Sequence, residues 1–286
     1  MIDLHAHTSE SDGTFSPAEL VNLAGAVGLE ALAVTDHDTL SGFDQARPFA
    51  REIGLDLVCG IEMSTRYEGR SVHLLGYFLE GDPGPDFRHW ILGLQQSRRA
   101  RNRKLLAKLQ ANGVTIPWDE LERTGGPLPG RPHIARLMVE HGFVDSIRAA
   151  FDEFLDESAC CYVARDEAPF ADAIDRIRMA GGISSLPHPG RVSSDSAEIC
   201  EIAKGMKAMG LMAIEVCHSD HSPAEVSFYA NLAEQLGLGM SGGTDFHGAT
   251  KPEIELGTGR SGNVCVSLST LEKLRLLHES RLPKNP

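Results

Sequence analysis

The chain has 286 residues, of which 42% are apolar, enough for one large hydrophobic core or for a core with an inserted subdomain. Its formal net charge of −13 argues against a protein that coats nucleic acid, although a local basic site is compatible with it. No run of about 18 apolar residues and no signal-peptide pattern is present, so we expect a cytoplasmic protein that does not enter a membrane.

Short apolar runs alternate with helical patterns over the first 82 residues. Ser16 and Pro17 are residue types that cap and begin a helix. Glu68-Gly69 separates two strand-like runs, which predicts a hairpin. The predicted strands are 2–4, 29–34, 56–61, 63–67 and 71–77, and the predicted helices are 17–27 and 41–53.

The pattern changes near residue 83. Pro83 and Pro85 interrupt the alternation, and a long helical pattern then runs over 87–111 and ends at Asn112-Gly113. A loop rich in glycine and proline precedes further helical segments. We therefore predict a mostly helical insert over 83–160.

Strands and helices alternate again after the insert. This arrangement predicts an α/β fold with a parallel sheet or barrel, built from residues 1–82 and 161–286. The letters of a dinucleotide-binding motif occur at 237–242, but there a helix ends and a strand begins, so that interpretation fails. The predicted strands are 182–186, 211–216 and 239–243, and the predicted helices are 170–180, 196–209 and 223–236.

Histidines and acids gather in or just after these strands. His5 and His7 are spaced i,i+2, so both point to one face of an extended chain. The carboxyl ends of strands meet at one rim of a barrel. Imidazoles and carboxylates without thiolates suit Mn²⁺, Zn²⁺ or Fe²⁺. The full set is His5, His7, Asp12, His37, Glu62, His73, His188, Asp245 and His247.

One histidine near a strand end is more often a satisfied polar residue than a ligand. Six of them with three interleaved acids would leave many buried polar atoms unpaired without a metal, at about 1–3 kcal/mol each. We therefore predict a metal centre. His218 and His221 lie within reach of it, but we do not interpret them as ligands.

Six sequence motifs are similar to those of the PHP (polymerase and histidinol phosphatase) family. They occur in the family's order and span residues 3 to 247. The resemblance implies a distorted seven-stranded (β/α)7 barrel with up to three metal ions at its rim. The loop 249–257 does not align. The motifs are Asp-Leu-His-Ala-His with Ser-Asp-Gly, Thr-Asp-His-Asp, Gly-Ile-Glu, Val-His-Leu-Leu-Gly, Pro-His-Pro-Gly-Arg and Thr-Asp-Phe-His.

The resemblance also implies the ligand sets and two to three divalent ions, with Mn²⁺ favoured and Zn²⁺, Fe²⁺ or Mg²⁺ as alternatives. Glu62 would bridge two ions, and His188 or His247 is a candidate proton donor to the leaving group. The catalytic candidates are Glu62, His188, Asp245 and His247. The implied sets are His5, His7, Glu62 and Asp245 for one ion, Glu62, His73 and His188 for a second, and Asp12, His37 and His247 for a third.

The insert locally reverses the sign of the chain's charge. Residues 87–118 contain seven arginines and lysines but no acid. A solvated helix face would explain this run as well as a phosphate site, although arginine forks match phosphate oxygens. The resemblance is closest to nucleoside 3′,5′-bisphosphate phosphatases and 5′–3′ exoribonucleases, and it implies substrate contacts for Arg98, Arg101, Arg131 and His133.

The sequence thus predicts a metal-dependent phosphatase or phosphodiesterase that acts on nucleoside 3′,5′-bisphosphates or on the 5′ end of short RNA. A histidinol-phosphate-type phosphatase, an inactive metal-binding regulatory module and a non-catalytic nucleic-acid-binding module are the alternatives. We expect no stable protein partner, a monomer or small homo-oligomer, and free thiols at the six scattered cysteines.

Overall fold

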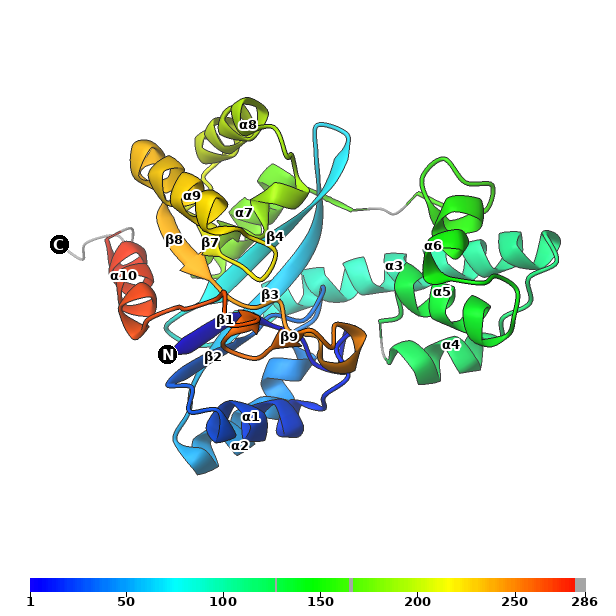
Figure 1. The fold of residues 1–286 in the computed structure, drawn as a ribbon, viewed down its shortest axis with the longest axis horizontal. Coiled ribbons are helices and arrows are strands. Elements are labelled where there is room, and N and C mark those ends of the chain that lie inside the picture. Colours follow the sequence, from blue (N-terminus) through cyan, green and yellow to red (C-terminus); the bar gives the residue numbers. More distant parts are fainter. Residues whose placement is uncertain (127, 165–166, 281–286) are drawn as a thin grey trace.

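A curved, nearly closed sheet forms the centre of the molecule (Figure 1), seen in a computed structural model that describes residues 1–126, 128–164 and 167–280. Its strands follow the order β1-β2-β3-β4-β6-β7-β8. A parallel bridge between Ala6 and Phe246 joins the two ends of this path. The expected α/β fold with a distorted seven-stranded barrel is confirmed. The strands are β1 (Ile2–Ala6), β2 (Ala31–Val34), β3 (Asp56–Tyr67), β4 (Arg70–Phe78), β6 (Ile183–Leu186), β7 (Ala213–Cys217) and β8 (Gly239–Gly242).

The barrel is distorted because one strand runs against its neighbours. β4 pairs antiparallel with both β3 and β6, whereas β1 with β2, β2 with β3, and β6 with β7 and β8 pair in parallel. The predicted hairpin is present. However, the sequence divided β3 into two strands, and it is one strand of 12 residues because backbone pairing continues through Glu62.

Helices cover the outside of the sheet. Figure 1 shows α1 and α2 on one side and α8 and α9 on the opposite side. Ser16 caps α1 as predicted, in a reciprocal capping box with Glu19. One apolar cluster lies between helices and sheet, and a second, with members from six strands and α10, fills the concave side. The helices are α1 (Pro17–Ala26), α2 (Ser41–Ile53), α7 (Phe170–Met179), α8 (Ser196–Ala208), α9 (Pro223–Leu236) and α10 (Leu268–Glu279).

The helices between β4 and β5 pack around a third apolar cluster of their own. In α3, Phe87 and Ile91 belong to the barrel core, whereas Leu105 and Leu109 belong to this third cluster. A helix of 27 residues is about 40 Å long, so α3 is a rigid connection between the two cores. The segment comprises α3 (Pro85–Ala111), α4 (Trp118–Gly125), α5 (Arg131–Glu140), α6 (Ile147–Ala150) and the π-helix η1 (Phe151–Leu155).

The sequence analysis did not predict several short elements. β5 pairs with β3 and returns the chain from the helical segment to the barrel. All six cysteines are free. In the described part of the chain, we find no helix with both the length and the apolar character needed to cross a membrane. The short elements are β5 (Ala168–Pro169), η2 (Pro189–Arg191), η3 (Gly248–Thr250), β9 (Ile254–Glu255) and β10 (Gly259–Arg260).

Barrel closure near the rim requires glycine at position 243. A Cβ atom there would lie 2.4 Å from the backbone nitrogen of His5. We therefore expect Gly243→Ala to lower the free energy of unfolding by about 1–3 kcal/mol, because the strands must move apart. Urea unfolding measures the change. Gly93→Ala is the control, since Gly93 lies in α3 with open space around its Cβ and should gain about 0.5–1 kcal/mol. Equal stability of the two variants would contradict the close approach.

Candidate metal centre and substrate pocket

Six strands and the loops that follow them bring the nine candidate ligands to one rim of the barrel. β1 carries His5 and leads into His7 and the loop with Asp12. β3 carries Glu62, and its backbone pairs with that of His37, which follows β2. The remaining candidates are His73 in β4, His188 after β6, and Asp245 and His247 after β8.

Glu62 lies at the centre of this cluster and is almost fully buried. Its Oε2 is 3.3 Å from His5 Nε2 and 3.2 Å from His7 Nε2. His37 Nδ1 lies 3.3 Å from the same oxygen. The other oxygen, Oε1, is 2.8 Å from His73 Nδ1 and 2.9 Å from His188 Nε2. One carboxylate thus faces five imidazoles, three through one oxygen and two through the other.

The other two acids connect the remaining rings. Asp245 Oδ1 lies 3.5 Å from His5 Nε2, 3.4 Å from His7 Nε2 and 3.4 Å from His247 Nδ1. Asp12 lies 3.5 Å from His7 Nδ1 and 3.3 Å from His247 Nε2. His7 therefore faces all three acids of the cluster.

Three overlapping groups have their ligand atoms within 4.8 Å of one another. The first contains the same four residues that the family resemblance implied for one ion. The second adds His7 to the implied third set. The last holds His37 in the place where the resemblance implied His188, although His188 also contacts Glu62. The groups are His5, His7, Glu62 and Asp245; His7, Asp12, His37 and His247; and His37, Glu62 and His73.

The donor set fits divalent metal ions. The ring nitrogens His5 Nε2, His7 Nε2 and His37 Nδ1 are buried and have no hydrogen-bond partner in the described part of the chain. Each faces a carboxylate oxygen at a distance longer than a direct hydrogen bond between charged groups. A cation between nitrogen and oxygen would satisfy both lone pairs, and imidazole with carboxylate is a donor set for Mn²⁺, Zn²⁺ or Fe²⁺.

Burial and neighbouring carboxylates shift the pKa values of the rim histidines in opposite directions. Burial lowers the pKa of His7, but the surrounding carboxylates outweigh it and raise this pKa to about 9. The same competition raises the pKa of His5 well above its usual range. Burial lowers the pKa of His37 to about 3 and that of His188 to about 4. A neutral His188 can offer a ring lone pair to a metal ion, and it is less suited to donate a proton.

Backbone conformation at the rim is strained where side chains are needed. Asp38, His188 and Asp245 have φ of 54°, 30° and 57°, in the left-handed region that glycine normally occupies. Each carries a carboxylate or imidazole that contacts the site. A glycine would relieve the strain but remove the contact, a pattern typical of functional positions.

Glu215 is a site residue that the sequence analysis missed. It is fully buried in β7, and its Oε1 lies 2.9 Å from His5 Nδ1. Its Oε2 accepts a hydrogen bond from the backbone N–H of His188 at 2.7 Å. With Nδ1 held by Glu215, His5 presents Nε2 to the cluster. The available signal was one acid inside an otherwise apolar buried strand.

Three side chains surround the outer oxygen of Asp245. Lys251 Nζ lies 2.6 Å and Arg191 Nη2 3.0 Å from Oδ2. His218 Nε2 lies 3.5 Å from it. The backbone N–H of Asp220 donates to His218 Nδ1, so the proton of the neutral ring lies on Nε2 and faces Asp245. His218 Nε2 thus faces Asp245 without a hydrogen bond in the described part of the chain. Lys251 comes from the loop that did not align.

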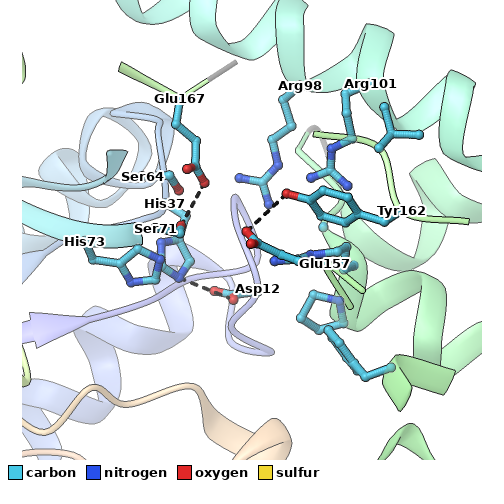
Figure 2. A pocket seen from close by; sticks show the side chains of 15 residues that line it. Asp12, His37, Ser64, Ser71, His73, Arg98, Arg101, Glu157, Tyr162 and Glu167 are labelled. Carbon is cyan, nitrogen blue, oxygen red and sulfur yellow. Dashed lines mark hydrogen bonds and ion pairs between the residues drawn. The ribbon is translucent and has the colours of Figure 1, made fainter. Parts of the chain in front are cut away.

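A cavity of about 200 Å³ opens beside the cluster (Figure 2). On its barrel side lie Asp12, His37 and His73. On the side of the helical segment lie the candidate substrate residues Arg98, Arg101 and Arg131, together with Glu157, whereas Glu167 lies on the barrel side beside Ser71. The cavity thus borders the metal-ligand candidates on one side and three guanidinium groups on the other.

The arginines are held in place by the helical segment. Arg131 donates to the carbonyl of Leu155, and its guanidinium lies 5.9 Å from the ring centroid of Phe151 and 5.8 Å from that of Tyr162. The π-helix η1 supplies Phe151 and Leu155, a use of such helices typical of functional sites.

Arg98 and His133, two further predicted substrate residues, have partners within the protein. Arg98 forms an ion pair of 3.1 Å with Asp38 and donates to the carbonyl of Pro129. His133 is not part of the cavity lining. Its Nδ1 accepts the N–H of Gly130, and burial lowers its pKa to about 4. His133 is therefore neutral, and the three arginines supply the positive charge of this wall.

Three relatives are similar to this chain over most of its length. The 5′-3′ exoribonuclease of Haemophilus influenzae is 32% identical and the match covers 86% of this chain and 89% of the relative. The 3′,5′-nucleoside bisphosphate phosphatase of Chromobacterium violaceum is 32% identical, covering 86% and 87%. The phosphoribosyl 1,2-cyclic phosphate 1,2-diphosphodiesterase of Eggerthella lenta is 30% identical, covering 86% and 94%.

The fold has a solved counterpart. A Bifidobacterium adolescentis protein assigned as a metal-dependent phosphoesterase aligns with a TM-score of 0.81 and 29% identity, over 96% of each chain. Together, the barrel and its imidazole–carboxylate rim define a metal-dependent phosphoesterase. The PHP domain pattern matches residues 3–157, and the chain belongs to this family.

The raised pKa values make metal-free stability depend on pH. Protonated His7, with a folded-state pKa of about 9 against 6.5 for an ordinary histidine, stabilises the fold fully below pH 6.5. That stabilisation is lost as the pH rises through 9. We expect the thermal midpoint of chelator-treated protein to fall over this window. Mn²⁺ affinity should rise over the same window, because binding displaces the protons. Calorimetry measures both, and a rising midpoint without metal would contradict the assignment.

Glu215 should control metal affinity without touching substrate. Glu215→Gln replaces one acceptor oxygen with an amide donor, which cannot accept from both His5 and the backbone of His188. We expect Mn²⁺ affinity to fall about 10- to 100-fold. Titration calorimetry on the metal-free protein provides the readout. Glu201→Gln, an exposed acid on α8, is the matched control. Unchanged affinity in Glu215→Gln would show that this contact does not orient His5.

Proposed function

We propose that this phosphoesterase removes the 3′-phosphate of nucleoside 3′,5′-bisphosphates and trims short 5′-phosphorylated RNA from its 5′ end. The nine rim residues would hold two to three divalent ions, and Mn²⁺ is the ion we favour. The observation that carries the proposal is the single cavity between those residues and three arginines. The names of two relatives, a bisphosphate phosphatase and a 5′-3′ exoribonuclease, support the same substrates.

The two sides of the cavity suit the two phosphates of one nucleotide. Arg131, whose guanidinium lies over two aromatic rings, would hold the 5′-phosphate through N–H groups that its bond to Leu155 leaves available. Asp12, His37 and His73 lie on the opposite side, where the 3′-phosphate would react. A 3′-phosphate that is terminal and one that links to the next nucleotide occupy the same place. A single geometry therefore covers a bisphosphate and an RNA end.

Bound divalent ions would neutralise charge on the phosphoryl group and lower the pKa of water in the site. The chain's own residues set the geometry for this chemistry. Glu62 would be shared between two ions, as its contacts with five histidines suggest. Asp245 and His247 would be further ligands of these ions. With His188 neutral, His247 stands as the candidate donor to the leaving oxygen.

A histidinol-phosphate-type phosphatase is the second candidate, because Glu157 and Glu167 also line the cavity. Two carboxylates could hold the amine of such a substrate. The three arginines that also line the cavity favour a second phosphate instead. A panel with Mn²⁺ separates the candidates: adenosine 3′,5′-bisphosphate, 5′-phosphorylated RNA tetramers and histidinol phosphate. Preference for histidinol phosphate would overturn the proposed function.

Arg131→Ala tests the anchoring of the 5′-phosphate. In the wild type we expect adenosine 3′,5′-bisphosphate to exceed 3′-AMP in kcat/KM by roughly 100-fold, since binding of the non-reacting phosphate positions the reacting one. The variant should lose most of this preference and leave 3′-AMP hydrolysis nearly unchanged. Arg136→Ala, an exposed arginine of the same helix, is the matched control. If the preference survives in Arg131→Ala, the anchor lies elsewhere.

A further inference from the structure

A carboxylate in a cavity built for phosphate needs an explanation. Glu157 follows η1 and lines the cavity, and its side chain is 57% exposed. Figure 2 shows it extending from the helical segment into the cavity, with a contact to Tyr162. Like charge would repel a phosphate there, so Glu157 serves neither phosphate site. Its place suits a neutral hydrogen-bond donor of the substrate.

The carboxylate of Glu157 is held on one side. Its Oε1 accepts the hydroxyl of Tyr162 at 3.2 Å, and Arg66 Nη2 from β3 lies 3.8 Å away. Arg66 Nη1 also lies 3.6 Å from Glu167, whose other oxygen accepts the hydroxyl of Ser71. These contacts join the helical segment to the β3–β4 hairpin and orient the acid, while no contact within hydrogen-bond distance involves its Oε2 in the described part of the chain.

The sugar of a nucleoside bisphosphate lies between its two phosphates. If the 5′-phosphate meets the arginines and the 3′-phosphate meets the rim, the ribose crosses the middle of the cavity. Its 2′-hydroxyl is the donor next to the reacting phosphate, and carboxylates accept hydrogen bonds from this group in other nucleotide sites. The 2′-hydroxyl also distinguishes RNA from DNA.

We propose that Glu157 is a specificity-determining residue that accepts a hydrogen bond from the ribose 2′-hydroxyl and makes the enzyme selective for ribonucleotides. This inference rests on the proposed function, since it uses the placement of both phosphates. It adds a residue and a selectivity that neither the metal cluster nor the arginines provide.

The test compares adenosine 3′,5′-bisphosphate with its 2′-deoxy analogue, both with Mn²⁺. We expect the wild type to favour the ribonucleotide in kcat/KM by about 10-fold or more, as for a hydrogen bond to a charged acceptor. In Glu157→Ala the ratio should fall towards 1. Because a negative charge leaves the cavity, KM for both nucleotides should also fall. Glu153→Ala, an exposed acid four residues earlier and outside the cavity, should keep the wild-type ratio.

Each other outcome overturns a defined part of the inference. Equal wild-type rates on both nucleotides remove the selectivity but leave the proposed function in place. If Glu157→Ala keeps the wild-type preference for the ribonucleotide, even with a lower KM, then Glu157 only repels anions and does not bind the 2′-hydroxyl. Hydrolysis of neither nucleotide contradicts the proposed function itself, and the inference with it.

Discussion

The shared carboxylate of Glu62 is the constraint on which the rest of the site depends. Five imidazoles face the two oxygens of this buried side chain. The lone pairs of nitrogen and oxygen repel one another unless cations or protons lie between them. Burial of that many polar atoms is costly without such cations. The left-handed backbone at His188 and Asp245 and the contacts of Glu215 hold side chains in the cluster around this carboxylate.

The helical segment supplies the opposite charge to a protein that is otherwise acidic. Because α3 belongs to two cores, the arginines on its middle turns stand at a fixed place beside the rim. Arg98 is paired with Asp38 next to β2, which ties this face of α3 to the metal-ligand loops. The candidate substrate residues and the candidate metal ligands therefore share structural supports.

Much of the fold could be predicted because its signals are local. Strand–helix alternation and Ser16 as a cap need only neighbouring residues, and the family motifs located the nine rim residues. Partners that form across the fold could not be predicted. Glu215 looks like an isolated acid in a strand until His5 lies beside it. The rings that hold Arg131 come from 20 and more residues away, and the π-helix that positions one of them has no distinct sequence pattern.

Metal content per chain is the most direct test of the shared carboxylate. Wild-type protein, Glu62→Gln and His247→Asn would be loaded with Mn²⁺, freed of excess ion and measured by elemental analysis. We expect two to three ions in the wild type, a loss of about one in His247→Asn and a larger loss in Glu62→Gln, because a bridging ligand serves two ions at once. Less than one ion in the wild type, or wild-type content in Glu62→Gln, would contradict a metal centre built around Glu62.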